Sequence, residues 1–157
     1  DKKLVIAGGS SQAMAYMEQI HRMAARDERI IMTDFVQGQI LEELYANAYA
    51  FVLPSDVEGM ALTLLEAMSY GDCCLVSDIR ENTEVVEDKA LTFKKGDVKD
   101  LRRQLAFMLE HPETVRRMGE ESVDYICGKY DWEDVTRRTL AVYRRAAGDK
   151  RPEKKEG

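Results

Sequence analysis

The sequence predicts an α/β fold, in which a mostly parallel sheet of about five strands lies between layers of helices. Two observations favour this fold. Five short apolar runs alternate with segments whose apolar residues recur at helical spacing, and such alternation is typical of parallel sheets. The last part of the chain carries helical patterns alone, so we expect those helices to pack over one side of the sheet. We predict one domain over residues 1–147 and a charged, disordered tail over 148–157.

The first two strands are predicted over residues 4–7 and 29–35, and each is followed by a helix. Gly8 and Gly9 come directly after the first strand, and Val36 and Gly38 lie in the loop after the second. Two glycines after a strand allow a ligand to approach the backbone closely, although they also serve simply to turn a chain. From the residues alone, both loops are therefore plain turns or parts of a binding site.

The centre of the chain reads as a strand over 50–53, a polar loop over 54–59, a helix from near Met60 and a strand over 73–76. Two apolar strands joined by a helix lie parallel in one sheet. In open parallel sheets the ligand crevice lies beyond the carboxyl ends of the strands. The 54–59 loop follows such an end and precedes a helix N-terminus, so this segment is the first candidate for a site.

The rest of the chain supplies a last strand over 90–93 and four helices. Asn82 or Thr83 is expected to cap a short helix, Asp97 and Asp131 to cap two longer ones, and Pro112 to open another. Arg80 is expected to pair with Glu81 or Glu84, with contact to a phosphate or an acceptor group as the alternative. The apolar contacts predicted for the last helix are Trp132, Val135, Leu140 and Tyr143.

Composition excludes several classes of function. The chain has 157 residues, 45% of them apolar, and a net charge of −6 with a pI near 5.1, which argues against a general nucleic-acid binder. We expect no transmembrane helix because no run of 18 apolar residues exists, and we also expect no signal peptide. The three cysteines form no metal-binding spacing and are expected to be reduced and mostly buried. They are Cys73, Cys74 and Cys127.

Glu58 and Glu66 flank the predicted start of the central helix. The free N–H groups of a first turn, together with the helix dipole, suit a phosphate. Glu66 would lie two turns into the helix, roughly 9 Å along its axis from Met60, and a carboxylate there accepts hydrogen bonds from sugar hydroxyls. The alternative is that Glu58 is a loop charge and Glu66 a solvated helix residue, since glutamates are common in helices.

The stretch PSDVEGMALTLLEAMSYGDCCLVSD resembles the E-x7-E signature of retaining, nucleotide-sugar-dependent glycosyltransferases of the GT-B class. The resemblance extends over about residues 4–146 through LVIAGGS, DFVQGQILEELYANA, DIRENTEVV, FKKGDVKDL and YDWEDVTRRTLAVY. It implies one Rossmann-like half of a two-domain enzyme, the C-terminal half that binds the donor. The implied reaction transfers a hexose from a nucleotide-diphosphate sugar to a hydroxyl acceptor with retention, and the N-terminal domain would supply most of the acceptor site.

The resemblance also implies roles for particular residues. Glu58, the residue assigned to catalysis, would accept hydrogen bonds from hydroxyls of the donor sugar, and Glu66 would bind the ribose. Backbone N–H groups would hold sugar and diphosphate, backbone groups of the first two loops would line the donor pocket and contact the base, and neither a metal nor a cofactor is expected. These backbone positions are Gly59, Met60, Ala61, Leu62 and Thr63 in the central unit, and Gly8, Gly9, Val36 and Gly38 in the first two loops.

Members of this family usually begin the donor domain with one more strand and helix, whose loop carries an Arg and a Lys for the pyrophosphate. This sequence opens after that unit, so we expect a fragment that binds nucleotide weakly and does not transfer sugar by itself. We expect it to be cytoplasmic. Full-length members often act at the inner membrane surface, as peripheral proteins, but nothing in this sequence requires membrane contact.

Three other functions are compatible with the pattern. A nucleotide-sugar epimerase of the same architecture would share the sheet and the crevice. A noncatalytic α/β module, with or without nucleotide binding, would share the fold alone. A receiver-type signalling domain would need clustered acids at strand ends, and here the second strand ends in Thr33 and Asp34 only. The donor sugar, the base and the acceptor are not indicated by any residue.

Overall fold

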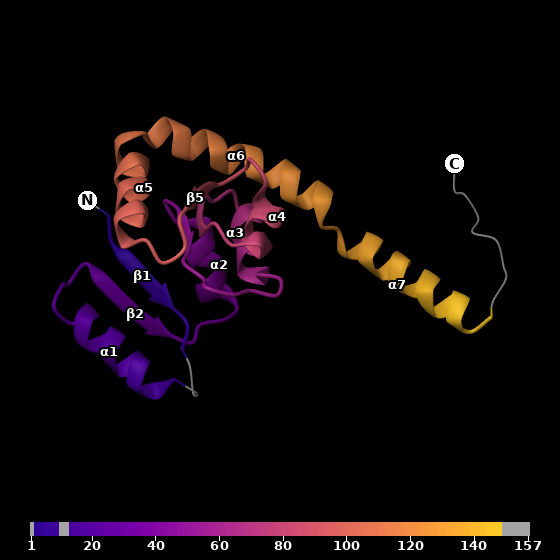
Figure 1. Cartoon of the computed structure of the whole chain (residues 1–157), viewed down its shortest axis with the longest axis horizontal. Helices are drawn as coiled ribbons and strands as arrows, with labels where there is room; N and C mark the ends of the chain where they lie inside the picture. The colour runs from indigo at the N-terminus through magenta and orange to yellow at the C-terminus, as the bar shows by residue number, and fades with distance from the viewer. Residues whose placement is uncertain (1, 10–12, 149–157) are drawn as a thin grey trace. The chain divides into compact units, whose positions relative to one another are not determined.

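The computed structural model describes residues 2–9 and 13–148, and it has the predicted α/β fold with five parallel strands among the described residues. The chain forms two compact units, Asp1–Asn47 and Ala48–Gly157 (Figure 1). The tail predicted to be disordered lies, except for Gly148, outside the described residues.

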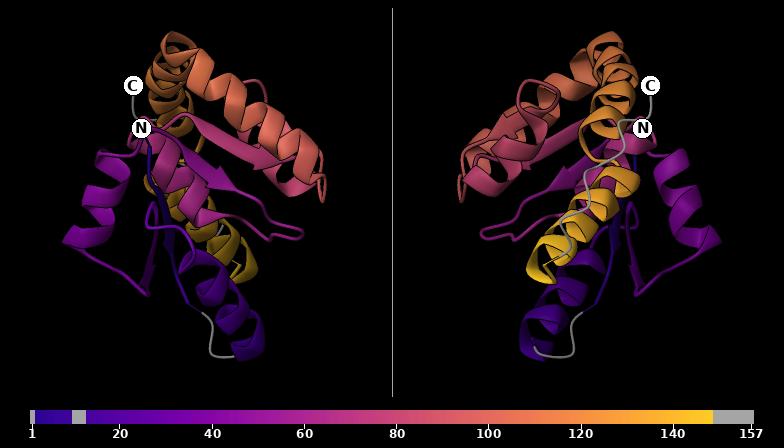
Figure 2. Two further views of the ribbon diagram at one scale, coloured as in Figure 1. Left: turned by 90° about the vertical axis from the view of Figure 1, so that its left-hand side faces the viewer. Right: turned by 90° about the vertical axis from the view of Figure 1, so that its right-hand side faces the viewer.

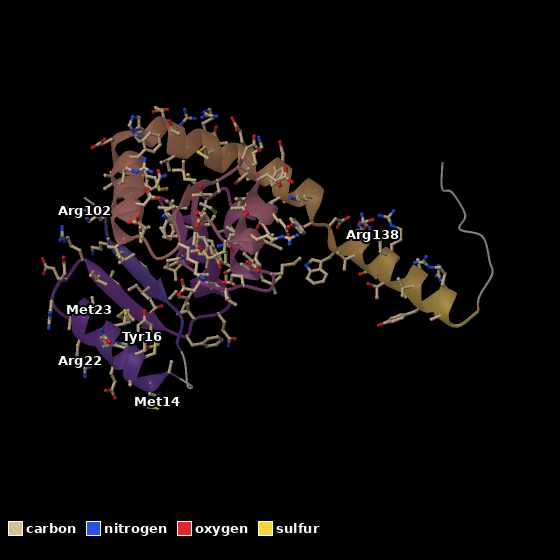
Figure 3. All side chains as sticks on the ribbon, viewed as in Figure 1. Met14, Tyr16, Arg22, Met23, Arg102 and Arg138 are labelled. Atoms are coloured by element: carbon tan, nitrogen blue, oxygen red, sulfur yellow. The ribbon has the colours of Figure 1, made fainter. Side chains whose placement is uncertain are left out.

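The first unit contains β1 (Leu4–Ala7), α1 (Met14–Ala24), β2 (Ile30–Asp34) and α2 (Gln39–Ala46). β1 and β2 pair in parallel, with Leu4 opposite Ile30, and the register shifts between Ile6 and Ala7. α1 contacts β2 and buries Ala24. Its remaining surface is largely exposed, as the side chains of Met14, Tyr16 and Met23 labelled in Figure 3 show. Both strands direct their carboxyl ends to the same edge of this unit.

The second unit contains a three-stranded parallel sheet in the order β3-β4-β5. Phe51 lies opposite Cys74, and Leu75 opposite Leu91. The five strands are therefore divided between two sheets, whereas the sequence had predicted one. Apolar periodicity identifies strands but not their partners, because pairing depends on tertiary contacts. The elements are β3 (Phe51–Leu53), α3 (Leu62–Ser69), β4 (Cys74–Ser77), α4 (Arg80–Val86), β5 (Leu91–Phe93), α5 (Val98–Glu110), α6 (Pro112–Lys129) and α7 (Trp132–Ala146).

The core of the second unit is built around β4, whose four residues are all buried. Helices α5 and α6, orange in Figure 2, contact each other, and α5 also contacts β5. Their side chains complete one apolar cluster with the strands, while α3 and α4 also contact β4. The buried members of that cluster are Cys73, Leu75, Phe93, Met108 and Val115.

The cysteines are free thiols, as expected. Cys73 and Cys74 are buried, and burial raises the pKa of the Cys73 thiol to about 11 and that of Cys74 well above its usual value. Cys127 differs from the prediction because it is exposed on α6. Its neighbour Ile126 takes the buried position on that helix instead.

Two of the predicted helix caps are confirmed and one is wrong. The Asp97 carboxylate accepts hydrogen bonds from the N–H groups of Lys99 and Asp100, and Asp131 accepts one from Glu133. Pro112 opens α6 as predicted. α4, however, begins at Arg80, so neither Asn82 nor Thr83 caps it. The Asn82 amide is instead buried and donates to Ser77, at the end of β4.

The predicted contacts of the last helix are also wrong. α7 has no buried residue, and Trp132 is 75% exposed. Val135, Leu140 and Tyr143 are exposed as well. Asp134 pairs with Arg137 and with Arg138, which Figure 3 labels on this helix. An amphipathic pattern predicts a helix with an apolar face, but it does not say which surface covers that face.

Candidate functional site

The site predicted in the centre of the chain lies where three strands end. The 54–59 loop leaves the carboxyl end of β3, and the neighbouring strands β4 and β5 are parallel to it. Their carboxyl ends, at Ser77 and Phe93, therefore lie along the same edge of the sheet. This arrangement brings three loops of the second unit together, and it is the position at which open parallel sheets bind ligands.

Glu58 is held within the loop that carries it. The hydroxyl of Ser55 donates a hydrogen bond of 2.6 Å to Oε1 of Glu58. Glu58 is half-buried, whereas the next two residues, Gly59 and Met60, are exposed. A Cβ atom placed on Gly59 would meet no atom within 4 Å, so the loop is open on that side. The carboxylate of Glu58 is therefore oriented by Ser55 of its own loop, and the residues that follow it are exposed.

Helix α3 begins later than the sequence predicted. Its first residue is Leu62, and Ala61 precedes it with φ −74° and ψ 86°, outside the helical region. Gly59 and Met60 therefore belong to the loop, and the first-turn N–H groups, which no preceding turn can satisfy, are those of Leu62 and Thr63. Glu66 lies one turn beyond Leu62, about 6 Å along the axis, rather than two turns from the helix start.

The two sides of α3 differ in exposure. Leu64, Ala67 and Met68 are buried and hold the helix in the domain. Leu62, Thr63 and Glu66 are exposed, and Leu62 and Glu66 share a face because they are four residues apart. Ala61 is only 6% exposed, so its methyl group is part of the packed interior. The residues assigned to diphosphate and ribose thus lie on the accessible side of the helix.

The ends of β4 and β5 contribute contacts that sequence reasoning missed. The Ser77 hydroxyl donates to the carbonyl oxygen of Ser55 at 2.5 Å, and Lys95 Nζ donates to the carbonyl oxygen of Asp56 at 2.7 Å. The carboxylate of Asp78 accepts the backbone N–H of Lys95 at 2.7 Å. The sequence holds a signal for these contacts, because residues that follow parallel strands meet at one edge, and Lys95 follows the strand predicted over 90–93.

The remaining predicted residues lie together in the first unit. The N–H of Gly8 donates to the carbonyl oxygen of Asp34 at 2.8 Å, which joins the loops after β1 and β2. Gly8 and Gly38 have φ values of +123° and +61°, which favour glycine. Gly38 precedes the first turn of α2, and Val36 lies in the same loop. Gly8, Gly9, Val36 and Gly38 therefore form one edge, in a different unit from Glu58 and Glu66.

Arg80 has the partner that the sequence predicted. Its Nε atom lies 2.6 Å from Oε1 of Glu84, one turn along α4, and both side chains are largely exposed. The hydrogen bond to Glu84 raises the pKa of Arg80 above its usual value. The Arg80 side chain is thus engaged within its own helix.

The described part of the chain offers no group of three His, Cys, Asp or Glu side chains placed to hold a metal ion. Within the same residues, each helix is either too short or too polar to cross a membrane.

Comparisons with known proteins identify relatives of the chain. Residues 1–124 match the family described as glycosyl transferases group 1. The chain is 27% identical over 146 residues to the O-antigen chain mannosyltransferase B of Escherichia coli, covering 90% of this chain and 37% of the relative. It is 32% identical over 111 residues to a sulfoquinovosyl transferase of Arabidopsis thaliana, covering 68% of this chain and 22% of the relative. The chain thus spans about a third or less of these relatives.

Solved structures share the fold. A sucrose-phosphate synthase from Thermosynechococcus elongatus superimposes with a TM-score of 0.81 at 21% identity, over 93% of this chain and 39% of that one. HepE from Anabaena, solved in complex with UDP-glucose, gives 0.82 at 14% identity, over 90% of this chain and 40% of that one. These likenesses confirm the predicted fold class, one half of a GT-B fold.

Proposed function

Since this chain belongs to the glycosyl transferases group 1 family, we propose that it binds the nucleotide-sugar donor of a retaining glycosyltransferase. The observation that carries the proposal is the position of Glu58 and Glu66. They lie on either side of the α3 N-terminus, beside the carboxyl ends of a parallel sheet. In this proposal the chain is the C-terminal half of the enzyme, and an N-terminal domain of the full-length protein supplies the acceptor site.

The donor would lie along α3. The first-turn N–H groups of Leu62 and Thr63 would bind the diphosphate, supported by the helix dipole. Glu66, one turn further along the same exposed side, would accept hydrogen bonds from the ribose hydroxyls. Glu58, in the loop before the helix, would accept them from the sugar hydroxyls. Gly8, Gly9, Val36 and Gly38 belong to the other unit, and backbone contact between their loops and a nucleotide stays a prediction. No metal ion or cofactor is assigned a role.

In the proposed reaction, the bond between the anomeric carbon of the sugar and the diphosphate oxygen breaks. A bond from that carbon to the acceptor hydroxyl oxygen forms on the same face, and the leaving diphosphate accepts the hydroxyl proton. The proposal of retention rests on the resemblance of residues 54–78 to the signature of retaining enzymes. A hexose donor is favoured because named relatives are a mannosyltransferase and a sulfoquinovosyl transferase, and HepE was solved with UDP-glucose.

Titration of the chain with UDP, GDP and ADP by calorimetry tests the donor site. We expect saturable binding of one of the three, weakened about tenfold or more by Glu66→Ala, the loss expected when a charged acceptor of hydroxyl hydrogen bonds is removed. Glu110→Ala, which removes an exposed glutamate at the end of α5, should leave binding unchanged. Failure of all three nucleotides to bind, both to this chain and to the full-length protein, would refute the proposal in favour of a noncatalytic module.

The reaction itself requires the full-length protein. Incubation with the identified donor and a hydroxyl acceptor should give a glycoside with the anomeric configuration of the donor, as read by proton NMR of the product. An inverted product would contradict the retaining assignment, and a rearranged sugar nucleotide formed without acceptor would indicate an epimerase.

A further inference from the structure

The 54–59 loop is held from outside by the two strands that follow it in the sheet. Consecutive carbonyl oxygens of the loop, those of Ser55 and Asp56, accept hydrogen bonds from the side chains of Ser77 and Lys95 respectively. The donors come from the ends of β4 and β5, 22 and 39 residues away in sequence. Two adjacent peptide groups of the loop are thereby fixed to the sheet.

The first of these contacts is itself supported by a buried amide. Asn82 Nδ2 donates to the Ser77 hydroxyl oxygen at 3.1 Å and to the Ser77 carbonyl oxygen at 3.3 Å. Because the hydroxyl accepts from Asn82, its own proton is available for Ser55. Ser77 is 1% exposed and Asn82 0%, so water does not compete for these bonds, and the direction of the Ser77 hydroxyl is determined.

The second contact is anchored by the backbone. The N–H of Lys95 donates to Asp78 Oδ1, and the N–H of Asp78 donates to the carbonyl oxygen of Phe93. Lys95 is therefore fixed at the end of β5 before its side chain extends to Asp56. Its ammonium group gives a charge-assisted hydrogen bond, which is stronger than a neutral one.

Both contacts hold residues that precede Glu58 in the loop. Ser55, whose carbonyl oxygen accepts from Ser77, donates its hydroxyl to the Glu58 carboxylate at 2.6 Å. The chain of bonds thus runs from Asn82 through Ser77 and Ser55 to Glu58, and Lys95 holds the intervening residue Asp56. The residues on both sides of Glu58 are exposed. Without the contacts from Ser77 and Lys95, the carboxylate would keep only its bond from Ser55, in a loop not held to the sheet.

We propose that Ser77 and Lys95 are positioning residues, which hold the 54–59 loop so that Glu58 meets the sugar of the donor. This inference rests on the proposed function, because it takes Glu58 as the acceptor of sugar hydroxyl hydrogen bonds. The nucleotide is held separately, by the first turn of α3 and Glu66. Release of the loop should therefore weaken recognition of the sugar and leave binding of the nucleoside diphosphate unaltered.

Lys95→Met tests this separation, because it removes the exposed ammonium group and keeps the backbone bond to Asp78. The dissociation constants of UDP and UDP-glucose, and of GDP and GDP-mannose, are compared by calorimetry on this chain. For the pair that binds, we expect the constant for the sugar nucleotide to rise about threefold to tenfold, the effect of one lost hydrogen bond. The constant for the free diphosphate should stay within about twofold by the same reasoning.

Lys94→Met is the matched control. It removes the same charge one residue away, and the bond recorded for Lys94 runs from its backbone N–H to Asp100 rather than from its side chain to the loop. Lys95→Arg, which can still donate to Asp56, should restore much of the sugar discrimination. Equal changes for diphosphate and sugar nucleotide, no change for either, or an equal effect of Lys94→Met would each overturn the proposal.

A measurement without ligand distinguishes this inference from the proposed function. Nitrogen-15 relaxation of the backbone amides of residues 56–60 should show a loop as ordered as the sheet, and Lys95→Met should increase its motion while Lys94→Met does not. An unaltered loop in Lys95→Met would refute the positioning role, even if nucleotides bind. Absence of nucleotide binding to any form of the protein would refute the proposed function, whatever the relaxation data show.

Discussion

Gly119 of α6 lies so close to Gly71 that a Cβ atom on Gly119 would be 2.1 Å from the Gly71 carbonyl oxygen. Gly71 ends the turn after α3 with φ +85°, a conformation that favours glycine. Next to this contact, the Ser122 hydroxyl donates to the carbonyl oxygens of Met68 and Gly119. α6 therefore packs directly on the backbone at the end of α3, the helix that carries Glu66.

Gly119→Ala should destabilise the chain because the added methyl group meets backbone, which cannot rotate away. We expect a loss of about 1–3 kcal/mol or more in the free energy of unfolding, as for other overpacked sites. Gly128→Ala on the same helix is the control, since a Cβ atom there meets nothing within 4 Å. It should instead stabilise the helix by up to about 1 kcal/mol. Urea denaturation measures both, and a neutral Gly119→Ala would show that the two helices can separate at little cost.

Asp72 should make stability depend on pH. It is 4% exposed, its Oδ2 atom has no hydrogen-bond partner among the described residues, and burial raises its pKa from 3.8 to about 7. The folded chain therefore holds this proton more tightly than the unfolded chain does. The stability due to the protonated form is complete below about pH 4, declines as pH rises from there, and is lost above about pH 7.

Asp72→Asn keeps the shape of the side chain and removes this titration. The variant and the original chain should have nearly the same unfolding free energy at pH 4. The variant should become the more stable of the two as pH rises toward neutral, because only the original chain has to bury a charge. The upper bound is about 4 kcal/mol, at about 1.4 kcal/mol per pH unit. Urea denaturation between pH 4 and pH 8 gives the difference at each pH. A constant difference across this range would mean that Asp72 is charged or hydrated in the folded state.

Asn82 and Ser77 should be energetically coupled, because each completes a hydrogen bond of the other inside the domain. Asn82→Ala and Ser77→Ala should each lower the unfolding free energy by about 1–3 kcal/mol, the cost of leaving a buried polar group unpaired. The double variant should lose less than the two single losses together, by about 0.5–2 kcal/mol. Strict additivity in this double-mutant cycle would contradict the direct bond.

Trp132 should contribute little to the stability of this chain. It is 75% exposed on α7, a helix with no buried residue, so Trp132→Ala should alter the unfolding free energy by no more than about 0.5 kcal/mol. As the chain contains one tryptophan, its fluorescence reports this environment directly. Emission like that of the free amino acid, with strong quenching by acrylamide, is expected. A blue-shifted and protected signal would show that α7 is covered.

The candidate site could be predicted from the sequence because its parts are close together in the chain. Glu58 and Glu66 lie eight residues apart, and the strand, loop and helix around them follow from apolar periodicity. Lys95 and Asn82 could not be found in this way. Lys95 reaches the 54–59 loop directly, and Asn82 acts on it through Ser77, only because β4 pairs with β3 and β5 pairs with β4. No local pattern records which strands are neighbours.

Helix boundaries also separate into those that local interactions predict and those that tertiary contacts change. Asp97 was predicted as a cap because its carboxylate bonds to N–H groups two and three residues away, an interaction that needs no tertiary structure. Asn82 was predicted as a cap on the same grounds, yet its amide is drawn to the end of β4. Local preference is overruled there because a buried polar group must be satisfied by the partners that surround it.

The sequence by itself determined the strands, most helices and the motif around Glu58, since each depends on the spacing of residues along a short stretch. The tertiary structure decided which strands pair, why Gly119 must be glycine and which side chains fix the 54–59 loop. It also decided that the apolar face of α7 is left exposed by the residues of this unit that the structure describes. These properties depend on contacts between residues tens of positions apart, and such contacts are set by how the elements pack.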